Sequence, residues 1–145
     1  ILLFCNGATV LSAQIDEAVE VLRKDEKLDS ACTVSSYDMW SPLRAKKIDD
    51  NGKLVPFVPL EIFGDNVTCD RGSQGQTWYA DCSTFVVRPK CMLKKNGDVP
   101  FTWLGRNIHP IKQWGGLDID YNWQVPIVEF WLKSHGFSET QTPYD

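Results

Sequence analysis

The fold is decided by residues 1–34, ILLFCNGATVLSAQIDEAVEVLRKDEKLDSACTV. The apolar run Ile1–Cys5 predicts a buried strand, and a loop over residues 6–11 follows it. Ser12 is suited to cap a helix whose apolar residues recur at helical spacing, at Ile15, Ala18, Val19 and Leu22. Ala31–Val34 predicts a second strand. A strand, a helix and a strand within this length form a βαβ unit, usually right-handed with parallel strands, so an α/β fold is predicted.

The rest of the chain adds a hairpin, a further strand and a terminal helix. In residues 45–57 (Ala45–Phe57), Asn51-Gly52 separates two short stretches, and Asn-Gly tolerates the positive φ angles of a tight turn, so a hairpin is predicted. Phe85-Val86-Val87 predicts a core strand. The last helix is expected to begin near Asn122 and to stop at Gly136.

Composition indicates one domain over residues 1–145. With 43% hydrophobic residues, a chain of this length can bury a proper core. The net charge of -4 gives no electrostatic case for binding nucleic acid or an anionic membrane. No apolar run approaches the length of a bilayer span, and no signal-peptide pattern opens the chain. The five cysteines form no C-x-x-C pair, so we expect reduced thiols in a cytoplasmic protein.

The candidate metal site is the segment Trp114-Gly115-Gly116-Leu117-Asp118-Ile119-Asp120, which precedes an apolar, helix-like run. Residues 117–120 alternate in character, as at the end of a strand, so Asp118 and Asp120 are expected to project to one side. Proteins usually hold Mg²⁺ by one or two carboxylates, with waters and substrate phosphates completing its shell. The segment therefore predicts a Mg²⁺ site, and a polar loop of solvated aspartates is the alternative.

Asp118-Ile119-Asp120 before the last helix resembles a motif of the cytidylyltransferases that make CMP-activated sialic acids and related sugar acids. Residues 2–9 and the helix after them resemble that family's first strand, loop and helix. Residues 71–86 resemble a region in which an arginine and glutamines precede an Asn-Gly strand, although Asp81-Cys82 stands here in place of Asn-Gly. The resemblance covers nearly the whole chain and implies a three-layer, Rossmann-like nucleotidyltransferase fold.

The resemblance also implies the activity. In that family the anomeric hydroxyl of a sugar acid attacks the α-phosphate of CTP, giving CMP-sugar and pyrophosphate, with Mg²⁺ as cofactor. Asp118 and Asp120 would be the catalytic metal pair, and either a metal-bound hydroxide or one of these carboxylates would deprotonate the sugar. The family's N-terminal CTP-binding loop has no counterpart in residues 1–145. The chain, which starts inside an apolar run, is therefore expected to be the C-terminal part of a longer enzyme and inactive alone.

Five residues are candidate substrate ligands: Asn6, Arg71, Gln74, Gln76 and Asp81. The fork of Arg71 suits the sugar carboxylate, and a surface ion pair is its alternative. Gln74 and Gln76 either reach sugar hydroxyls or are solvated. Asp81 matches a family ligand position, with a strand-edge charge as the alternative. Asn6 follows the first predicted strand, where open α/β sheets bind ligands, although asparagine also suits a turn.

The resemblance further implies a homodimer, because the family dimerises through a mid-chain hairpin and residues 45–57 resemble one. Two other functions compete with the cytidylyltransferase. One is a non-catalytic remnant that keeps the fold and acts as a dimerising binding module. The other is a nucleotide-sugar-dependent transferase of the same broad fold, in which an Asp-x-Asp would also hold the metal.

Overall fold

The computed structural model describes residues 1–37 and 39–145, which form two compact units. Unit 1 contains residues 1–35 and 80–145, and unit 2 contains residues 36–79. The helices and strands, in chain order, are α1 (Ser12–Lys24), β1 (Ser30–Ser35), β2 (Lys46–Ile48), β3 (Leu54–Pro56), α2 (Arg71–Gln74), β4 (Tyr79–Val87), α3 (Pro89–Lys94), β5 (Ile108–Gln113) and α4 (Val125–Ser134). Short 3₁₀ helices occur at Pro42–Arg44, Leu60–Phe63, Thr102–Leu104 and Asn122–Gln124.

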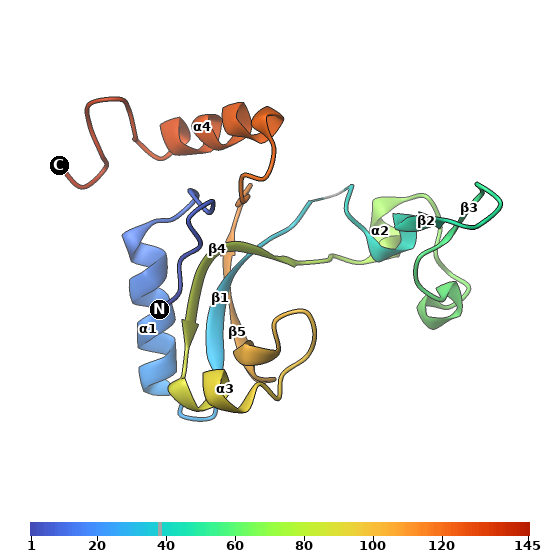
Figure 1. The fold of residues 1–145 in the computed structure, drawn as a ribbon, viewed down its shortest axis with the longest axis horizontal. Coiled ribbons are helices and arrows are strands. Elements are labelled where there is room, and N and C mark those ends of the chain that lie inside the picture. The colour runs from blue at the N-terminus through green and yellow to red at the C-terminus, as the bar shows by residue number, and fades with distance from the viewer. Residues whose placement is uncertain (38) are drawn as a thin grey trace. The chain divides into compact units, whose positions relative to one another are not determined.

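Unit 1 is built on a three-stranded sheet in the order β4-β1-β5 (Figure 1). β1 and β5 are parallel, with Ser30 opposite Ile108 and Ser35 opposite Gln113. The N–H of Arg88, just after β4, donates to the carbonyl of Asp29, just before β1, at 3.0 Å. The end of β4 therefore lies beside the start of β1, and these two strands are antiparallel. The mixed sheet with its helices confirms the α/β class, while the nucleotidyltransferase-like topology stays a prediction.

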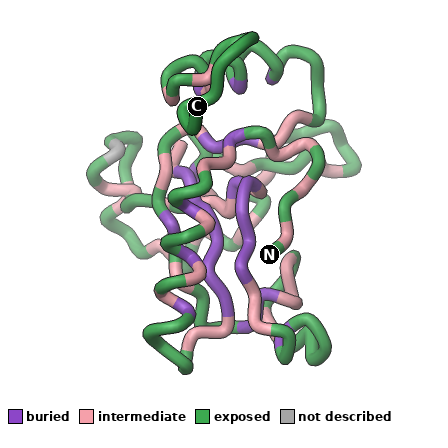
Figure 2. Tube along the Cα trace, turned by 90° about the vertical axis from the view of Figure 1, so that its left-hand side faces the viewer, coloured by how far each residue is buried: buried purple, intermediate pink, exposed green. Residues whose placement is uncertain are grey.

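The helix α1 packs on one face of this sheet through the apolar residues that its sequence pattern predicted. Ala18 and Leu22 form a cluster with Ala31, Val86 and Ile111, one from each strand of the sheet. Figure 2 shows that buried residues follow the strands and recur along α1. Burying such side chains stabilises the fold by about 1.5–3 kcal/mol for each large aliphatic residue.

The start of α1 differs in detail from the prediction. The helix includes Ser12, and the residue in the cap position is Leu11. The side-chain oxygen of Gln14 accepts a hydrogen bond from the N–H of Leu11 at 3.1 Å. A glutamine one turn inside the helix thus meets the donor at the start of the helix, a role that the sequence suggested for Ser12.

A second apolar cluster contains Phe85, Val34 and Leu104. Phe4 packs against this cluster, with its ring centroid 5.4 Å from that of Phe85. The ring of Trp103 meets the same phenylalanine edge-on at 5.0 Å. Aromatic pairs prefer such tilted arrangements, so Phe85 anchors two segments that form no regular strand.

The prediction of a buried strand over Ile1–Cys5 is wrong. The segment makes only an isolated antiparallel bridge, between Leu2 and Phe85, and Ile1 and Leu3 are exposed. The parallel βαβ unit that was expected to include this segment is therefore absent. The segment lies against one edge of the sheet, and only alternate side chains face the core. The parallel pairing of β1 is instead with β5.

β5 was missed in the sequence because Pro110 lies in its middle. Proline cannot donate a ladder hydrogen bond and is confined to edge strands or bulges. β5 is indeed an edge of the three-stranded sheet, with only β1 beside it. The other expected elements are confirmed. β1 contains Ala31–Val34, β4 contains Phe85-Val86-Val87, and α4 follows a 3₁₀ turn that begins at Asn122.

Unit 2 contains the predicted hairpin. β2 and β3 are antiparallel, with Lys46 opposite Pro56 and Ile48 opposite Leu54. Gly52 in the connecting turn has φ of +74°, a conformation that glycine adopts without steric cost. In the described part of the chain, no helix combines the length and the apolar character needed to cross a bilayer.

Candidate functional site

Two of the predicted site segments meet at Asn6 and Asp120. The side-chain amide of Asn6 donates a hydrogen bond to Asp120 Oδ1 at 3.2 Å. The backbone carbonyl of Asn6 accepts from the N–H of Ile119 at 2.9 Å, and Gly7 forms an antiparallel bridge with Asp118. Residues 6–7 and 118–120 are therefore paired side by side, although more than a hundred positions separate them in the sequence. The expected strand end over residues 117–120 is reduced to this single bridge.

Cys82 connects these segments to β4. Burial raises the pKa of its thiol to about 11, and the nearby carboxylates of Asp118, Asp81 and Asp120 contribute to the rise. Cys82 therefore lies near three carboxylates: Asp81 from the same strand, and Asp118 and Asp120 from the segment that pairs with residues 6–7. Cys82 also has φ of +63°, and a Cβ on Gly7 would lie 2.7 Å from its carbonyl oxygen. The N-terminal loop can approach β4 this closely because residue 7 is a glycine.

Asp81 is buried, with 6% of its surface exposed, and it has no cationic partner among the described residues. Its Oδ1 accepts hydrogen bonds from Thr33 Oγ1 at 2.6 Å and from the N–H of Ser83 at 3.2 Å. Its Oδ2 accepts from Ser35 Oγ at 2.7 Å and from Gln113 Nε2 at 2.9 Å. A carboxylate has about four lone-pair positions, so these four donors satisfy it within the protein.

The hydroxyl groups around Asp81 also hold the segment that carries the two aspartates. Ser35 Oγ accepts from the N–H of Gly116 at 3.0 Å, and Thr9 Oγ1 accepts from the N–H of Leu117 at 3.1 Å. Sequence analysis missed Thr9, Ser35 and Gln113 as site residues. The available signal was the alternation of Thr33 and Ser35 at the carboxyl end of a buried strand, where polar side chains need partners.

Asp118 and Asp120 carry carboxylate oxygens, the ligand type that a hard cation prefers. Asp118 is half-buried and Asp120 is exposed, so both lie within reach of solvent. Across residues 1–37 and 39–145, no group of three or more His, Cys, Asp or Glu side chains is placed to bind a metal. A pair of carboxylates is the ligand number with which Mg²⁺ is usually bound when phosphates and waters supply the rest. The two residues would hold the ion, with Asn6 orienting Asp120.

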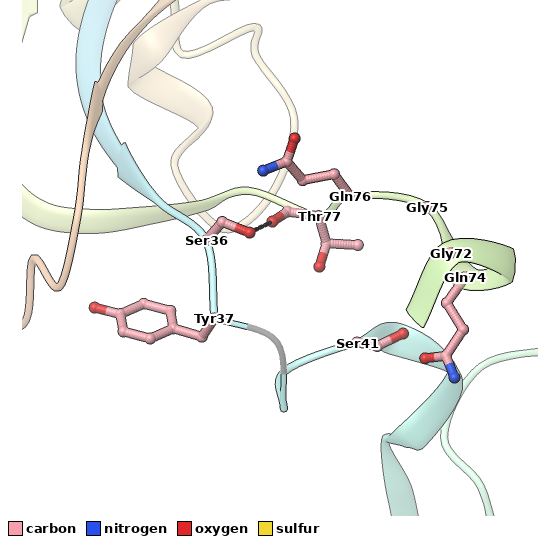
Figure 3. Close-up of a pocket in the computed structure, with 8 residues that line it drawn as sticks. All are labelled: Ser36, Tyr37, Ser41, Gly72, Gln74, Gly75, Gln76 and Thr77. Carbon is pink, nitrogen blue, oxygen red and sulfur yellow. Dashed lines mark hydrogen bonds between the residues drawn. The ribbon is translucent and has the colours of Figure 1, made fainter. Parts of the chain in front are cut away.

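Gln74 and Gln76 lie in unit 2 and line one pocket of about 360 Å³ (Figure 3). The other lining residues are Ser36, Tyr37, Ser41, Gly72, Gly75 and Thr77. Gln74 Nε2 donates to the carbonyl of Thr68 at 3.0 Å, and Figure 3 shows the two glutamine side chains leaving the segment in different directions. The pocket offers hydroxyl, amide and backbone groups, which suit an uncharged polar ligand.

Arg71 is the first residue of α2, and its side chain lies outside the part of the chain that the structure describes. Its predicted role toward a sugar carboxylate stays a prediction. Of the seven predicted site residues, the structure therefore brings Asn6, Asp118 and Asp120 together next to Asp81, and it brings Gln74 and Gln76 to one pocket. Comparison with protein-family models and with curated proteins finds no match for this chain.

Proposed function

We propose that this chain is the sugar-acid and metal portion of a cytidylyltransferase, which activates a sialic-acid-like sugar acid with CTP to give CMP-sugar and pyrophosphate. The observation that carries the proposal is the pairing of Asn6 with Asp120 beside Asp118. The family resemblance includes these two segments together with residues 71–86, and the two segments lie far apart in the sequence. Their meeting at one place is what a shared site requires.

The location supports the proposal as well. β1 and β5 run parallel and end at Ser35 and Gln113, and Gly116 is hydrogen-bonded to that same Ser35. The aspartate segment therefore begins just beyond the carboxyl ends of parallel strands. In open α/β sheets, ligands bind in this region.

In the proposed reaction, the anomeric oxygen forms a bond to the α-phosphorus of CTP. The bond from that phosphorus to the bridging oxygen breaks, and pyrophosphate leaves with the electron pair. Mg²⁺ would supply charge neutralisation on the phosphates. The chain's own residues hold and orient: Asp118 and Asp120 present oxygen ligands, and either carboxylate is suited to accept the proton of the sugar hydroxyl.

A dimerising binding module is the second candidate, because the hairpin of unit 2 exposes apolar side chains. Ile48 and Leu54 face each other across the two strands, and each is 72% exposed. A solvated hairpin has no need of such side chains, whereas an interface between proteins does. This function needs no metal or nucleotide, so ligand binding separates it from the enzyme.

The first experiment is ligand-observed NMR of the 145-residue chain with a panel of sialic-type sugar acids, with and without Mg²⁺ and CTP. We expect saturation transfer to sugar acids that carry a carboxylate and a weaker signal in Arg71→Ala. The exposed Arg23, which pairs only with Glu20 in the described structure, provides the matched control Arg23→Ala.

Metal binding is tested separately by paramagnetic broadening with Mn²⁺. Asp120→Ala is expected to lose site-specific broadening of residues 118–120 with an unchanged fold, and the exposed Asp16→Ala is the control. If the folded chain binds no sugar acid and Mn²⁺ broadens the Asp120→Ala variant like the wild type, the cytidylyltransferase proposal is wrong. A dimer that binds neither ligand would favour the binding module.

A further inference from the structure

We propose that buried Asp81 is the positioning residue of the Asp118–Asp120 segment, acting through the directions in which its neighbours donate their hydrogen bonds. The inference rests on the proposed function and deepens it, because it gives a role to a buried carboxylate whose four hydrogen-bond donors all come from the protein itself. Its physical basis is that an ionised carboxylate only accepts. Every neighbour must therefore turn a hydrogen toward it.

The first consequence concerns the hydroxyl of Ser35. Its single hydrogen points to Asp81 Oδ2 at 2.7 Å, so its lone pairs face away from the carboxylate. One of them accepts the N–H of Gly116 at 3.0 Å. A hydroxyl can otherwise rotate and donate elsewhere. Here the Asp81 carboxylate takes the hydroxyl hydrogen, so Ser35 Oγ remains an acceptor for the N–H of Gly116. The hydrogen bond to an ionised group is also stronger than a neutral one.

The second consequence concerns the amide of Gln113. Because Asp81 accepts, Gln113 turns its Nε2 toward the carboxylate at 2.9 Å, and its Oε1 is left to face Gln14 Nε2 at 2.7 Å. Gln14 then presents its own oxygen to the N–H of Leu11 at the start of α1. The same charge thus sets the orientation of two amides in turn and fixes the end of the N-terminal loop.

A third branch reaches the loop through Thr9. Gln113 Nε2 also lies 3.2 Å from Ser83 Oγ, which shares a hydrogen bond of 2.6 Å with Thr9 Oγ1. Thr9 Oγ1 accepts the N–H of Leu117. The branches therefore end on both segments that pair at the candidate site: residues 9–11 follow Asn6, and residues 116–117 precede Asp118. The aspartates are held from both sides by one buried charge.

The chain offers a matched pair of variants for the test. Ser35→Ala and Thr33→Val each remove one hydroxyl that donates to Asp81, but only Ser35 contacts the loop. Thr33 Oγ1 instead accepts the N–H of Thr84 within the sheet. Asp81→Asn is nearly isosteric and replaces one carboxylate oxygen by an N–H₂ donor, so the two neighbours that donate to that oxygen lose their acceptor. The measurement is amide hydrogen exchange of residues 116–120, with global unfolding by urea recorded for each variant.

We expect exchange at Leu117 and in residues 118–120 to speed up roughly tenfold in Ser35→Ala and Asp81→Asn, the effect of one net hydrogen bond. Thr33→Val is expected to lower the urea midpoint with the exchange of these residues changed only by the shift in global stability. The inference is overturned if Thr33→Val loosens the loop as much as Ser35→Ala, or if both leave it unchanged. If Asp81→Asn does not fold, Gln113→Leu takes its place, because it removes a donor to Asp81 and leaves the Ser35–Gly116 hydrogen bond in place; unchanged exchange of residues 116–120 in this variant would also overturn the inference.

The exchange measurement does not depend on the proposed enzyme. Mn²⁺ affinity, recorded on the same variants, is expected to fall in Ser35→Ala and to stay at the wild-type value in Thr33→Val. Failure of the wild type to bind Mn²⁺ would contradict the proposed function and leave the exchange result as the test of positioning. Normal Mn²⁺ binding with equal exchange in both variants would contradict the positioning role alone.

Discussion

Asn6 donates its side-chain amide to Asp120 Oδ1 at 3.2 Å, so one oxygen of this exposed carboxylate has a neutral hydrogen-bond donor as its partner. The contact joins the N-terminal loop to the segment before α4. Asparagine suits position 6 because its amide can donate a hydrogen bond to the Asp120 carboxylate, whereas a second carboxylate there would repel it.

This relationship predicts that Asn6→Asp destabilises the metal-free chain and increases its response to Mg²⁺. Like charges at this distance near water cost about 1 kcal/mol, and a cation between them reverses the sign of the effect. Thermal unfolding with a chelator and with Mg²⁺ measures both effects. Asn96→Asp, at an exposed position, is the control. An equal Mg²⁺ response in the two variants would contradict a metal site at Asp120.

Gly116→Ala is predicted to break the hydrogen bonds that hold residues 116–117 next to Asp81. A Cβ at this position would lie 2.3 Å from Asp81 Oδ2 and 2.4 Å from Gln113 Nε2. Buried groups that hold one another by hydrogen bonds cannot move apart freely, so we expect a loss of about 1–3 kcal/mol in urea unfolding. Gly72→Ala is the control, since an added Cβ there meets nothing within 4 Å. Equal stability of the two variants would show that the loop can shift.

The sequence predicted the elements whose signals are local. α1 has its apolar residues at helical spacing, and the hairpin has Asn51-Gly52 at its turn, so each follows from neighbouring residues alone. The segment Ile1–Cys5 has the composition of a buried strand, but only long-range pairing decides whether both its faces are covered. β5 was hidden by Pro110, which is acceptable only because the strand is an edge.

The candidate site also contains some residues that local sequence predicts and others that depend on long-range pairing. Asp118 and Asp120 were predicted from their spacing, and Asn6 from its place after an apolar run. The buried surroundings of Asp81 depend on Ser35 and Gln113, which reach it only after the strands have paired in register. No local pattern distinguishes such a carboxylate from an exposed one, so its network became apparent only in the folded chain.

At position 82, a glycine variant is predicted to be more stable than an alanine variant, whereas glycine in a strand is usually the less stable of the two. Its φ of +63° costs a residue with a Cβ about 1–2 kcal/mol. Cys82→Gly should therefore be more stable than Cys82→Ala by about 1 kcal/mol in urea unfolding. Ala80→Gly, in the same strand but without a positive φ, should lose about 0.5–1 kcal/mol. If Cys82→Ala is the more stable of the two variants, the left-handed conformation does not persist in solution.

Leu54→Lys is predicted to weaken self-association through the hairpin. Leu54 and Ile48 form an exposed apolar pair, and burying a leucine contributes about 1.5–3 kcal/mol, so two copies would change a dimer constant by roughly a hundredfold or more. Sedimentation velocity over a concentration series measures this. Lys47→Ala, in the partner strand β2 of the same hairpin, is the control. A chain that is monomeric throughout would remove the dimer from both proposed functions.

Asp29 is predicted to make the stability of unit 1 depend on pH in the acid range. The backbone N–H groups of Arg106 and Asn107 donate to its carboxylate at 3.1 Å and 3.2 Å, and they lower its pKa from 3.8 to about 2. Because the folded pKa lies below the unfolded value, the contribution of Asp29 to the free energy of unfolding is fully present above pH 3.8 and is lost as the pH falls toward about 2.

Asp29→Asn keeps an oxygen for these donors and removes the charge. Its free energy of unfolding should therefore fall short of the wild-type value at neutral pH and converge with it as the acid range is crossed. A difference between the two proteins that stays constant with pH would assign the effect of the substitution to packing against the backbone of Gly105, which lies so close that a Cβ added there would be 2.5 Å from the Cβ of Asp29.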